Sequence, residues 1–153
     1  MKIQFKKAKL TDVELMRKLV TPEVELGIIL DRTAEEISTN IRSYTLAQID
    51  DKLIGFCALH IHSPLLGEIR SLIVKDKFRG LGIGKELVKL ANEEAIDLGL
   101  KKILTLTYKQ KFFEDLGFVE IAKESIPEHK IWADCIKCKH FPVCNEVSLI
   151  KTI

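Results

Sequence analysis

The segment 78–87, "FRGLGIGKEL", decides the fold because it joins a strand-like apolar run to a helix-like one. It holds three of the eight glycines of the chain, Gly80, Gly82 and Gly84, and the cations Arg79 and Lys85 flank them. Glycine carries no side chain, so its backbone amide can approach a ligand closely. The flanking cations indicate that this ligand is an anion.

The glycine spacing argues against two common phosphate-binding loops. A P-loop has about four residues between its first glycine and its Gly-Lys pair, and Ser or Thr follows that pair. Here Gly80 and Gly84 enclose fewer residues, and Glu86 follows Lys85. In a dinucleotide-binding loop the third glycine follows the second by about three positions, whereas Gly84 lies closer than that to Gly82. The remaining interpretation is a helix N-terminus with free amides facing a phosphate or pyrophosphate. A solvent-exposed loop is the alternative.

Length and composition favour one soluble globular domain over residues 1–153. Such a chain can bury roughly two thirds of its unfolded surface. Hydrophobic residues make up 46% and charged residues 30%, and the net charge of +2 gives no global field for nucleic acid. No segment resembles a secretory signal or a membrane span, so we expect a cytoplasmic protein without a membrane partner.

The pattern predicts a mixed α/β fold with a central, mostly antiparallel sheet of about seven strands flanked by about four helices. Strands are expected at 3–8, 44–49, 52–61, 68–74, 101–107, 118–123 and 146–151. A long helix is expected from Gly84 to a stop at Gly99, and a short one over 111–116.

Two capping boxes predict the remaining helices. Thr11 and Glu14 are expected to start a helix that ends near Leu19, and Thr33 and Glu36 to start a second, short one. The stretch 21–30 between them is predicted to be a loop. Asp50 and its neighbour Asp51 form the two-residue polar turn expected of an antiparallel hairpin.

The motif "RGLGIG" (79–84) resembles the Arg/Gln-x-x-Gly-x-Gly/Ala motif of the GCN5-related N-acetyltransferases, and "EIRSLIV" and "FFEDLGF" extend the resemblance from about Ile54 to Phe118. It implies that acetyl-CoA is the co-substrate, with its thioester in a gap between strands 68–74 and 101–107. The cofactor-binding residues that it implies are Leu72, Ile73, Val74, Arg79, Gly80, Leu81, Gly82, Ile83, Gly84, Lys85 and Phe113.

Acetyl transfer needs a neutral amine and therefore a base. By the resemblance Glu68 is the candidate base, and an exposed charge at a strand start is the alternative. Relatives use a tyrosine as general acid where this chain has Phe113. Either Tyr108 takes that role, or the thiolate leaves unassisted because it is a good leaving group, with Tyr108 then a plain loop aromatic.

Strand alternation places Arg70 on the same face as Glu68. A guanidinium there favours an acceptor that carries a carboxylate and disfavours polyamines. The segments "EIRSLIV", "LTLTYKQKFFEDLGF" and 126–150 also resemble the short N-acetylglutamate synthase type, which acetylates glutamate at the start of arginine biosynthesis. This resemblance adds Lys109, Lys130 and Trp132 to the glutamate pocket. The kinase domain of longer synthases, which binds arginine, would not fit in this length.

Four potential zinc ligands, Cys135, Cys138, His140 and Cys144, lie within "CIKCKHFPVC". So short a segment can hardly surround a metal without strain, so we expect thiols in a loop and no metal. Cys57 is expected to be a small core residue. His60 and His62 share one strand face and are expected to be hydrogen-bonded rather than metal-bound.

Other functions remain open at this point. The same fold could acetylate another amine, such as a protein N-terminus, a lysine or an antibiotic. A CoA-binding or metal-binding module without turnover is the alternative from a different class, because the tyrosine is missing and cysteines cluster. A small-molecule substrate is the expected partner; dimers are common among such small enzymes, and nucleic acid ranks last.

Overall fold

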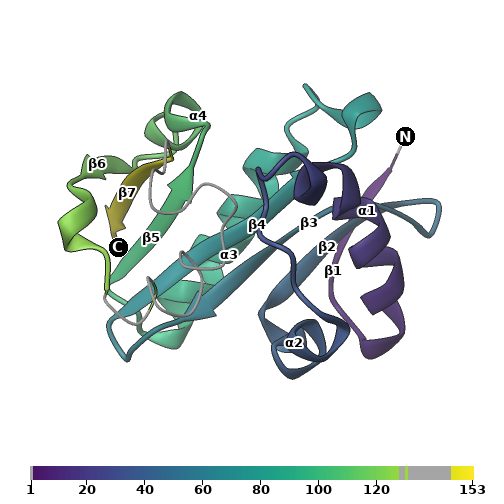
Figure 1. Ribbon diagram of the computed structural model, residues 1–153, viewed down its shortest axis with the longest axis horizontal. Coiled ribbons are helices and arrows are strands. Elements are labelled where there is room, and N and C mark those ends of the chain that lie inside the picture. The colour runs from purple at the N-terminus through teal and green to yellow at the C-terminus, as the bar shows by residue number, and fades with distance from the viewer. Residues whose placement is uncertain (1, 128–129, 131–145) are drawn as a thin grey trace.

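The computed structural model describes residues 2–127, 130 and 146–153, and it confirms the mixed α/β class. Its seven-stranded sheet has the order β1-β2-β3-β4-β5-β7-β6 (Figure 1). The strands are β1 (Ile3–Lys7), β2 (Tyr44–Ile49), β3 (Lys52–Ile61), β4 (Leu66–Val74), β5 (Lys102–Thr107), β6 (Val119–Ile121) and β7 (Val147–Thr152). The described α-helices are α1 (Val13–Glu25), α2 (Ala34–Thr39), α3 (Ile83–Leu98) and α4 (Gln110–Glu114).

The first helix differs from its prediction. Thr11 lies inside a 3₁₀ turn, and the carboxylate of Asp12 accepts the Lys9 N–H at 2.8 Å in place of a Thr11 cap. Helix α1 continues past Leu19 to Glu25, although Pro22 lies in its last turn, so part of the predicted loop is helical. Tertiary packing of α1 on the sheet extends a helix that its own sequence signals would have ended.

Other local signals are confirmed. Thr33 caps α2 and accepts the Glu36 N–H at 3.1 Å, with Glu36 completing the capping box. Asp50 and Asp51 both have positive φ, as the tight turn between β2 and β3 requires. Gly99, at φ 91°, ends α3 in the left-handed conformation.

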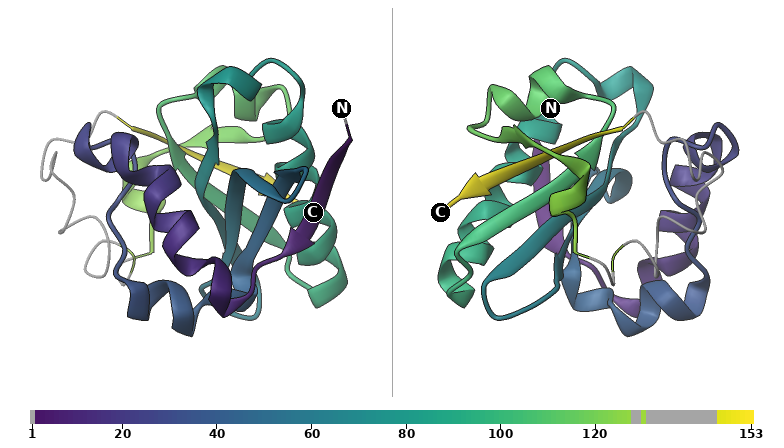
Figure 2. Two further views of the ribbon diagram at one scale, coloured as in Figure 1. Left: turned by 90° about the vertical axis from the view of Figure 1, so that its right-hand side faces the viewer. Right: turned by 60° about the vertical axis from the view of Figure 1, so that its left-hand side comes forward.

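The sheet is covered on both faces. Buried side chains of α3, among them Leu87, Val88 and Ala91, pack on one face with Ile54, Leu59 and Ile103. Val13 and Met16 of α1 and Ile37 of α2 pack on the other face with Leu46, Phe56 and Ile73. Figure 2 shows α3 and the α1–α2 pair on opposite sides of the strands. We call the side that carries α1 and α2 the α1 face.

Strands β4 and β5 part at a defined point. They pair in parallel through Leu66, Gly67 and Glu68 only, and Glu68 stands opposite Leu104. One step further, the buried Thr105 hydroxyl donates to the Ile69 carbonyl at 3.0 Å, and the strands then diverge (Figure 1). The gap predicted between these two strands is therefore confirmed. We call the Glu68–Leu104 position the vertex.

A bulge interrupts β4 just beyond the vertex. Along the β3–β4 ladder Ala58 pairs with Arg70 and Phe56 with Ile73, and between these pairs Ser71 has φ 58°. The extra residue reverses the alternation, so Ile73 packs on the α1 face beside Phe56. A non-glycine residue with positive φ is a strained conformation that often occurs at functional sites.

Among the described residues, no helix combines the length and the apolar character that crossing a membrane would require.

Leu87 tests how much α3 contributes to the fold. It is fully buried between α3 and the sheet, so Leu87→Ala should lower the free energy of unfolding by about 2–5 kcal/mol, measured by chemical denaturation. Leu98→Ala on the same helix, where the side chain is 62% exposed, should change it by less than about 0.5 kcal/mol. Equal effects of the two substitutions would contradict the packing of α3.

Candidate active site

A pocket of about 640 Å³ opens on the α1 face between the diverging strands. Its walls come from the end of α1, the loop 26–32 that follows, β4 from Glu68 to Val74, and the end of β5 with Tyr108 and Lys109. The predicted residues Leu72, Ile73 and Val74 all line it. The parting of β4 and β5 thus creates a cavity bounded by backbone that no longer pairs across the gap.

Glu68 lies at the narrow end of this pocket, at the vertex. It is only 1% exposed, so the exposed-charge alternative is wrong. The Oε1 atom lies 2.8 Å from Nε2 of His62, and Oε2 lies 2.7 Å from Nζ of Lys130. Burial alone would raise the pKa of Glu68, but the His62 hydrogen bond and Lys130, with Arg70 nearby, outweigh it and leave the pKa below its usual value.

Lys130 has a further contact besides its predicted place in the pocket. Its side chain is 7% exposed, and its ammonium forms the ion pair with Glu68. It does line the pocket, as expected, but its charge balances Glu68. Lys130 follows β6 in the chain, so this ion pair links a residue distant in sequence to β4 at the vertex.

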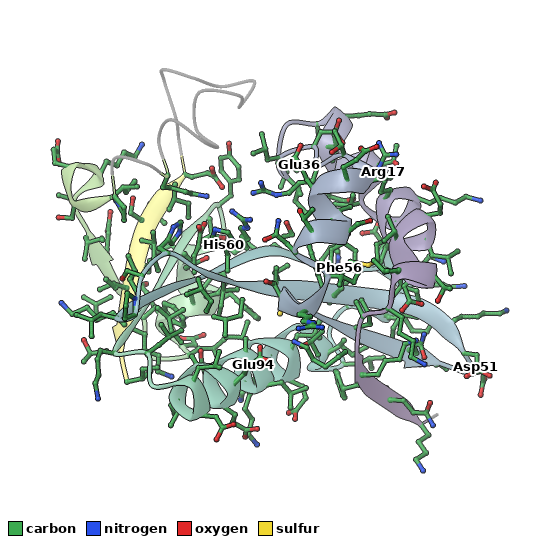
Figure 3. All side chains as sticks on the ribbon, turned by 90° about the horizontal axis from the view of Figure 1, so that it is seen from below. Arg17, Glu36, Asp51, Phe56, His60 and Glu94 are labelled. Atoms are coloured by element: carbon green, nitrogen blue, oxygen red, sulfur yellow. The ribbon has the colours of Figure 1, made fainter. Side chains whose placement is uncertain are left out.

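Histidine side chains accompany Glu68 on the α1 face. His60 stands opposite Glu68 in the β3–β4 register, and its ring lies 4.9 Å from that of His62 in an edge-on arrangement. Figure 3 places His60 on the side of the sheet opposite to Glu94 of α3. The prediction of hydrogen-bonded strand histidines is confirmed for His62. Cys57 on the same strand is a core residue as expected, and burial raises its pKa to about 12.

Two arginines besides Arg79 line the pocket. Arg70 comes from β4 just before the bulge, as strand alternation predicted. Arg32 comes from the loop before α2, and its side chain is 11% exposed with Nη1 3.9 Å from Glu36. No sequence pattern singles out Arg32, because only the tertiary fold brings this loop to the pocket. Its position directly before the Thr33 cap was the one local signal available.

Arg79 is held at the opposite end of the pocket. Its Nε donates to the Val74 carbonyl at 2.9 Å, Nη1 lies 2.8 Å from Asp76, and Nη2 lies 3.5 Å from Glu23 of α1. The side chain therefore links the glycine loop to β4 and α1. A cofactor bound by Arg79, as predicted, would meet a guanidinium group that is already paired with Glu23 and Asp76.

The glycine loop continues from Arg79 alongside the pocket. Gly80 and Gly82 have φ of 81° and 79°, and a Cβ built on either would meet no atom within 4 Å, so the space above the loop is open. Glu86 already donates to the Gly82 carbonyl at 3.0 Å, which leaves the amides before it as the N-terminal donors of α3. Residues 80–85 flank the pocket rather than line it. The side chain of Ile83 is buried in the core, so only its backbone faces outward.

The aromatic positions differ in exposure. Tyr108 is 41% exposed and lines the pocket just after β5. Phe113 also lines the pocket, but it is 2% exposed and packs edge-on against Phe112 and Phe118, so it is mainly a core residue. Lys109 lines the pocket at the N-terminus of α4.

Trp132 and the segment with Cys135, Cys138, His140 and Cys144 lie outside the described residues, so the predictions made for them stay predictions. Within the residues that are described, no group of three or more His, Cys, Asp or Glu side chains is placed to hold a metal ion.

The profile of the Acetyltransferase (GNAT) family matches residues 14–118, which span the glycine loop, the vertex and α4. The chain belongs to this family. It is an N-acetyltransferase of the GNAT type with acetyl-CoA as co-substrate, as the motif "RGLGIG" implied. The open space above Gly80 and Gly82, ahead of the donors of α3, fits the anionic part of that co-substrate.

Relatives of known sequence extend the comparison. An uncharacterised N-acetyltransferase of Chlorobaculum tepidum is 36% identical over 146 residues, which cover 95% of this chain and 94% of that protein. The amino-acid acetyltransferase of Enterobacter sp. is 27% identical over 129 residues, covering 83% of this chain. The match spans only 29% of the length of that protein.

A solved structure has the same fold. The N-acetylglutamate synthase of Neisseria gonorrhoeae, complexed with coenzyme A and N-acetyl-glutamate, superposes with a TM-score of 0.88 at 22% identity. The superposition covers 99% of this chain and 35% of that one. This chain thus spans about a third of the length of the Neisseria synthase.

The helix N-terminus predicts a matched pair of glycine substitutions. Gly82→Ala and Gly99→Ala each place a Cβ at positive φ with no atom nearby, so each should cost about 1–2 kcal/mol of stability. Only Gly82→Ala should weaken acetyl-CoA binding in calorimetry, by about tenfold, because it turns the donor amides away. Equal affinity of the two folded variants would remove the anion site from this loop.

Proposed function

We propose that this GNAT acetyltransferase transfers the acetyl group from the sulfur of acetyl-CoA to the α-amine of a small acidic amino acid, L-glutamate above all. The observation that carries the proposal is that two arginines from separate elements, Arg70 from β4 and Arg32 from the loop before α2, line one pocket. The product would be N-acetylglutamate, with which arginine biosynthesis begins.

The charges of the pocket support an acidic acceptor. A guanidinium binds a carboxylate through two parallel hydrogen bonds, and a glutamate acceptor carries two carboxylates for two arginines. Glu68 contacts Lys130, and Glu23 and Asp76 contact Arg79, so these three acidic groups are already engaged by cations; Asp31 and Glu146 also line the pocket. A polyamine would have to approach both guanidinium groups without a carboxylate of its own.

The acceptor amine reaches the site as an ammonium and must lose a proton before it can attack. We assign this proton to Glu68, directly or through one water molecule. A base must be deprotonated at the working pH, and the lowered pKa of Glu68 ensures that form. Two of its lone-pair positions are occupied by His62 and Lys130, and a carboxylate has about four.

The leaving thiolate needs little help because thiols ionise not far above neutral pH. Tyr108 lies in the pocket wall and is the phenol that we assign to donate a proton to the thiolate. Phe113 has no proton to give, and its packing against Phe112 and Phe118 makes it a wall of the site.

An acceptor panel tests the proposal. Purified protein with acetyl-CoA should release CoA thiol with glutamate at a kcat/KM at least about tenfold above that with glutamine, lysine, spermidine or a peptide. One charge-assisted carboxylate contact accounts for such a ratio. Glutamine is the matched control, because it differs from glutamate only in the second carboxylate. A panel in which glutamate gave no stimulation would refute the assignment.

Arg70 separates the acceptor from the co-substrate. Arg70→Ala should raise the KM for glutamate by at least about tenfold and leave the affinity for acetyl-CoA within about twofold. Arg42→Ala, an exposed arginine before β2, is the control and should change neither. Equal weakening of both substrates by Arg70→Ala would place Arg70 outside the acceptor site.

A further inference from the structure

The carboxylate at the vertex is fixed by two donors from separate parts of the chain. Nε2 of His62, just after β3, lies 2.8 Å from Oε1 of Glu68, and Nζ of Lys130 lies 2.7 Å from Oε2. The side chains of all three residues are nearly inaccessible, with exposures of 3%, 2% and 7% for His62, Glu68 and Lys130. Such a buried cluster costs desolvation energy, which its contacts must offset.

We propose that His62 is a positioning residue of the acetyl transfer, which holds the Glu68 carboxylate in the orientation that receives the proton of the acceptor. This inference rests on the proposed role of Glu68 and extends it to a residue that does not line the pocket.

The two donors perform different tasks. Lys130 carries the charge that balances the buried carboxylate, so Glu68 can remain ionised. His62 supplies direction. An ionised carboxylate only accepts hydrogen bonds, so Nε2 of His62 is the donor, and its ring fixes the rotation of the carboxyl group about its last bond. Each oxygen then has one donor, and its other lone pair remains for the proton of the acceptor.

His62 is itself held in place by the architecture. It follows directly on β3, whose His60 ring packs edge-on against it at 4.9 Å. The backbone N–H of His62 donates to the Leu66 carbonyl at 2.9 Å, and this hydrogen bond closes the turn into β4. The turn thus sets the direction from which the imidazole meets Glu68.

Loss of the His62 contact has a defined effect on pH dependence. The groups that face Glu68 are His62 and His60 from the β3 side, Arg70 on β4, and Lys130. The hydrogen bond from His62 favours the ionised carboxylate. Its removal should raise the pKa of Glu68, so the acid limb of the kcat profile should move to higher pH.

The experiment measures kcat and KM against pH for His62→Leu, His62→Gln and His62→Asn, with the acceptor that gives the greatest turnover in the panel. His62→Leu should lower kcat by at least about tenfold, move the acid limb to higher pH and leave the KM for acetyl-CoA within about twofold. His62→Gln, whose amide extends about as far as Nε2, should recover most of the rate. His62→Asn is too short to reach Oε1 and should not.

Thr105→Val is the structural control. It removes the hydrogen bond to Ile69 at the same vertex without touching Glu68, so it should lower the melting temperature and leave the acid limb in place. The double variant Glu68→Gln with Lys130→Met removes both charges together, and adding His62→Leu to it should cost little further activity.

An unshifted acid limb in His62→Leu, or in His62→Asn if the leucine variant does not fold, would overturn the positioning role. So would an equal shift in Thr105→Val. Because the assay uses whichever acceptor is active, failure of the glutamate assignment and failure of the His62 inference give different results.

Discussion

The site depends on the point where β4 and β5 stop pairing. A parallel pair continues as long as backbone donors and acceptors face each other, and here the ladder ends at Glu68 and Leu104. The buried Thr105 hydroxyl takes over at the next step by binding the Ile69 carbonyl. Beyond it the strands diverge, and the freed backbone of β4 becomes a wall of the pocket. Glu68, His62 and Lys130 form a buried cluster at this point.

The two ends of the pocket use opposite electrostatic designs. At the glycine loop, the backbone amides and the dipole of α3 favour an anion. Arg79 beside the loop is already paired with Glu23 and Asp76. At the vertex, Glu68 and Lys130 balance each other, with Arg70 close by on β4, and Arg32 lines the same pocket. This division suits a two-substrate enzyme, because the anionic co-substrate and the proposed acidic acceptor meet separate groups.

Membership in the GNAT family establishes the reaction class. The residues that line this pocket select the acceptor. The relatives named amino-acid acetyltransferase share the domain but are much longer, and this chain covers 29% of the Enterobacter protein. The proposal of glutamate therefore rests chiefly on the residues of this chain at the vertex. Arg32 and Arg70 come from different elements, so their joint presence in one pocket is a property of the fold.

Local signals determined much of the architecture. Glycines at the N-terminus and C-terminus of α3, the Thr33 cap and the Asp50–Asp51 turn each act over a few residues, so the sequence alone predicted them. Strand alternation likewise predicted that Glu68 and Arg70 lie on one face of their strand. The tertiary structure alone decided the length of α1, the bulge at Ser71, the inclusion of Arg32 and the partners of Glu68. These depend on contacts between segments far apart in the chain, whose free energy no local pattern records.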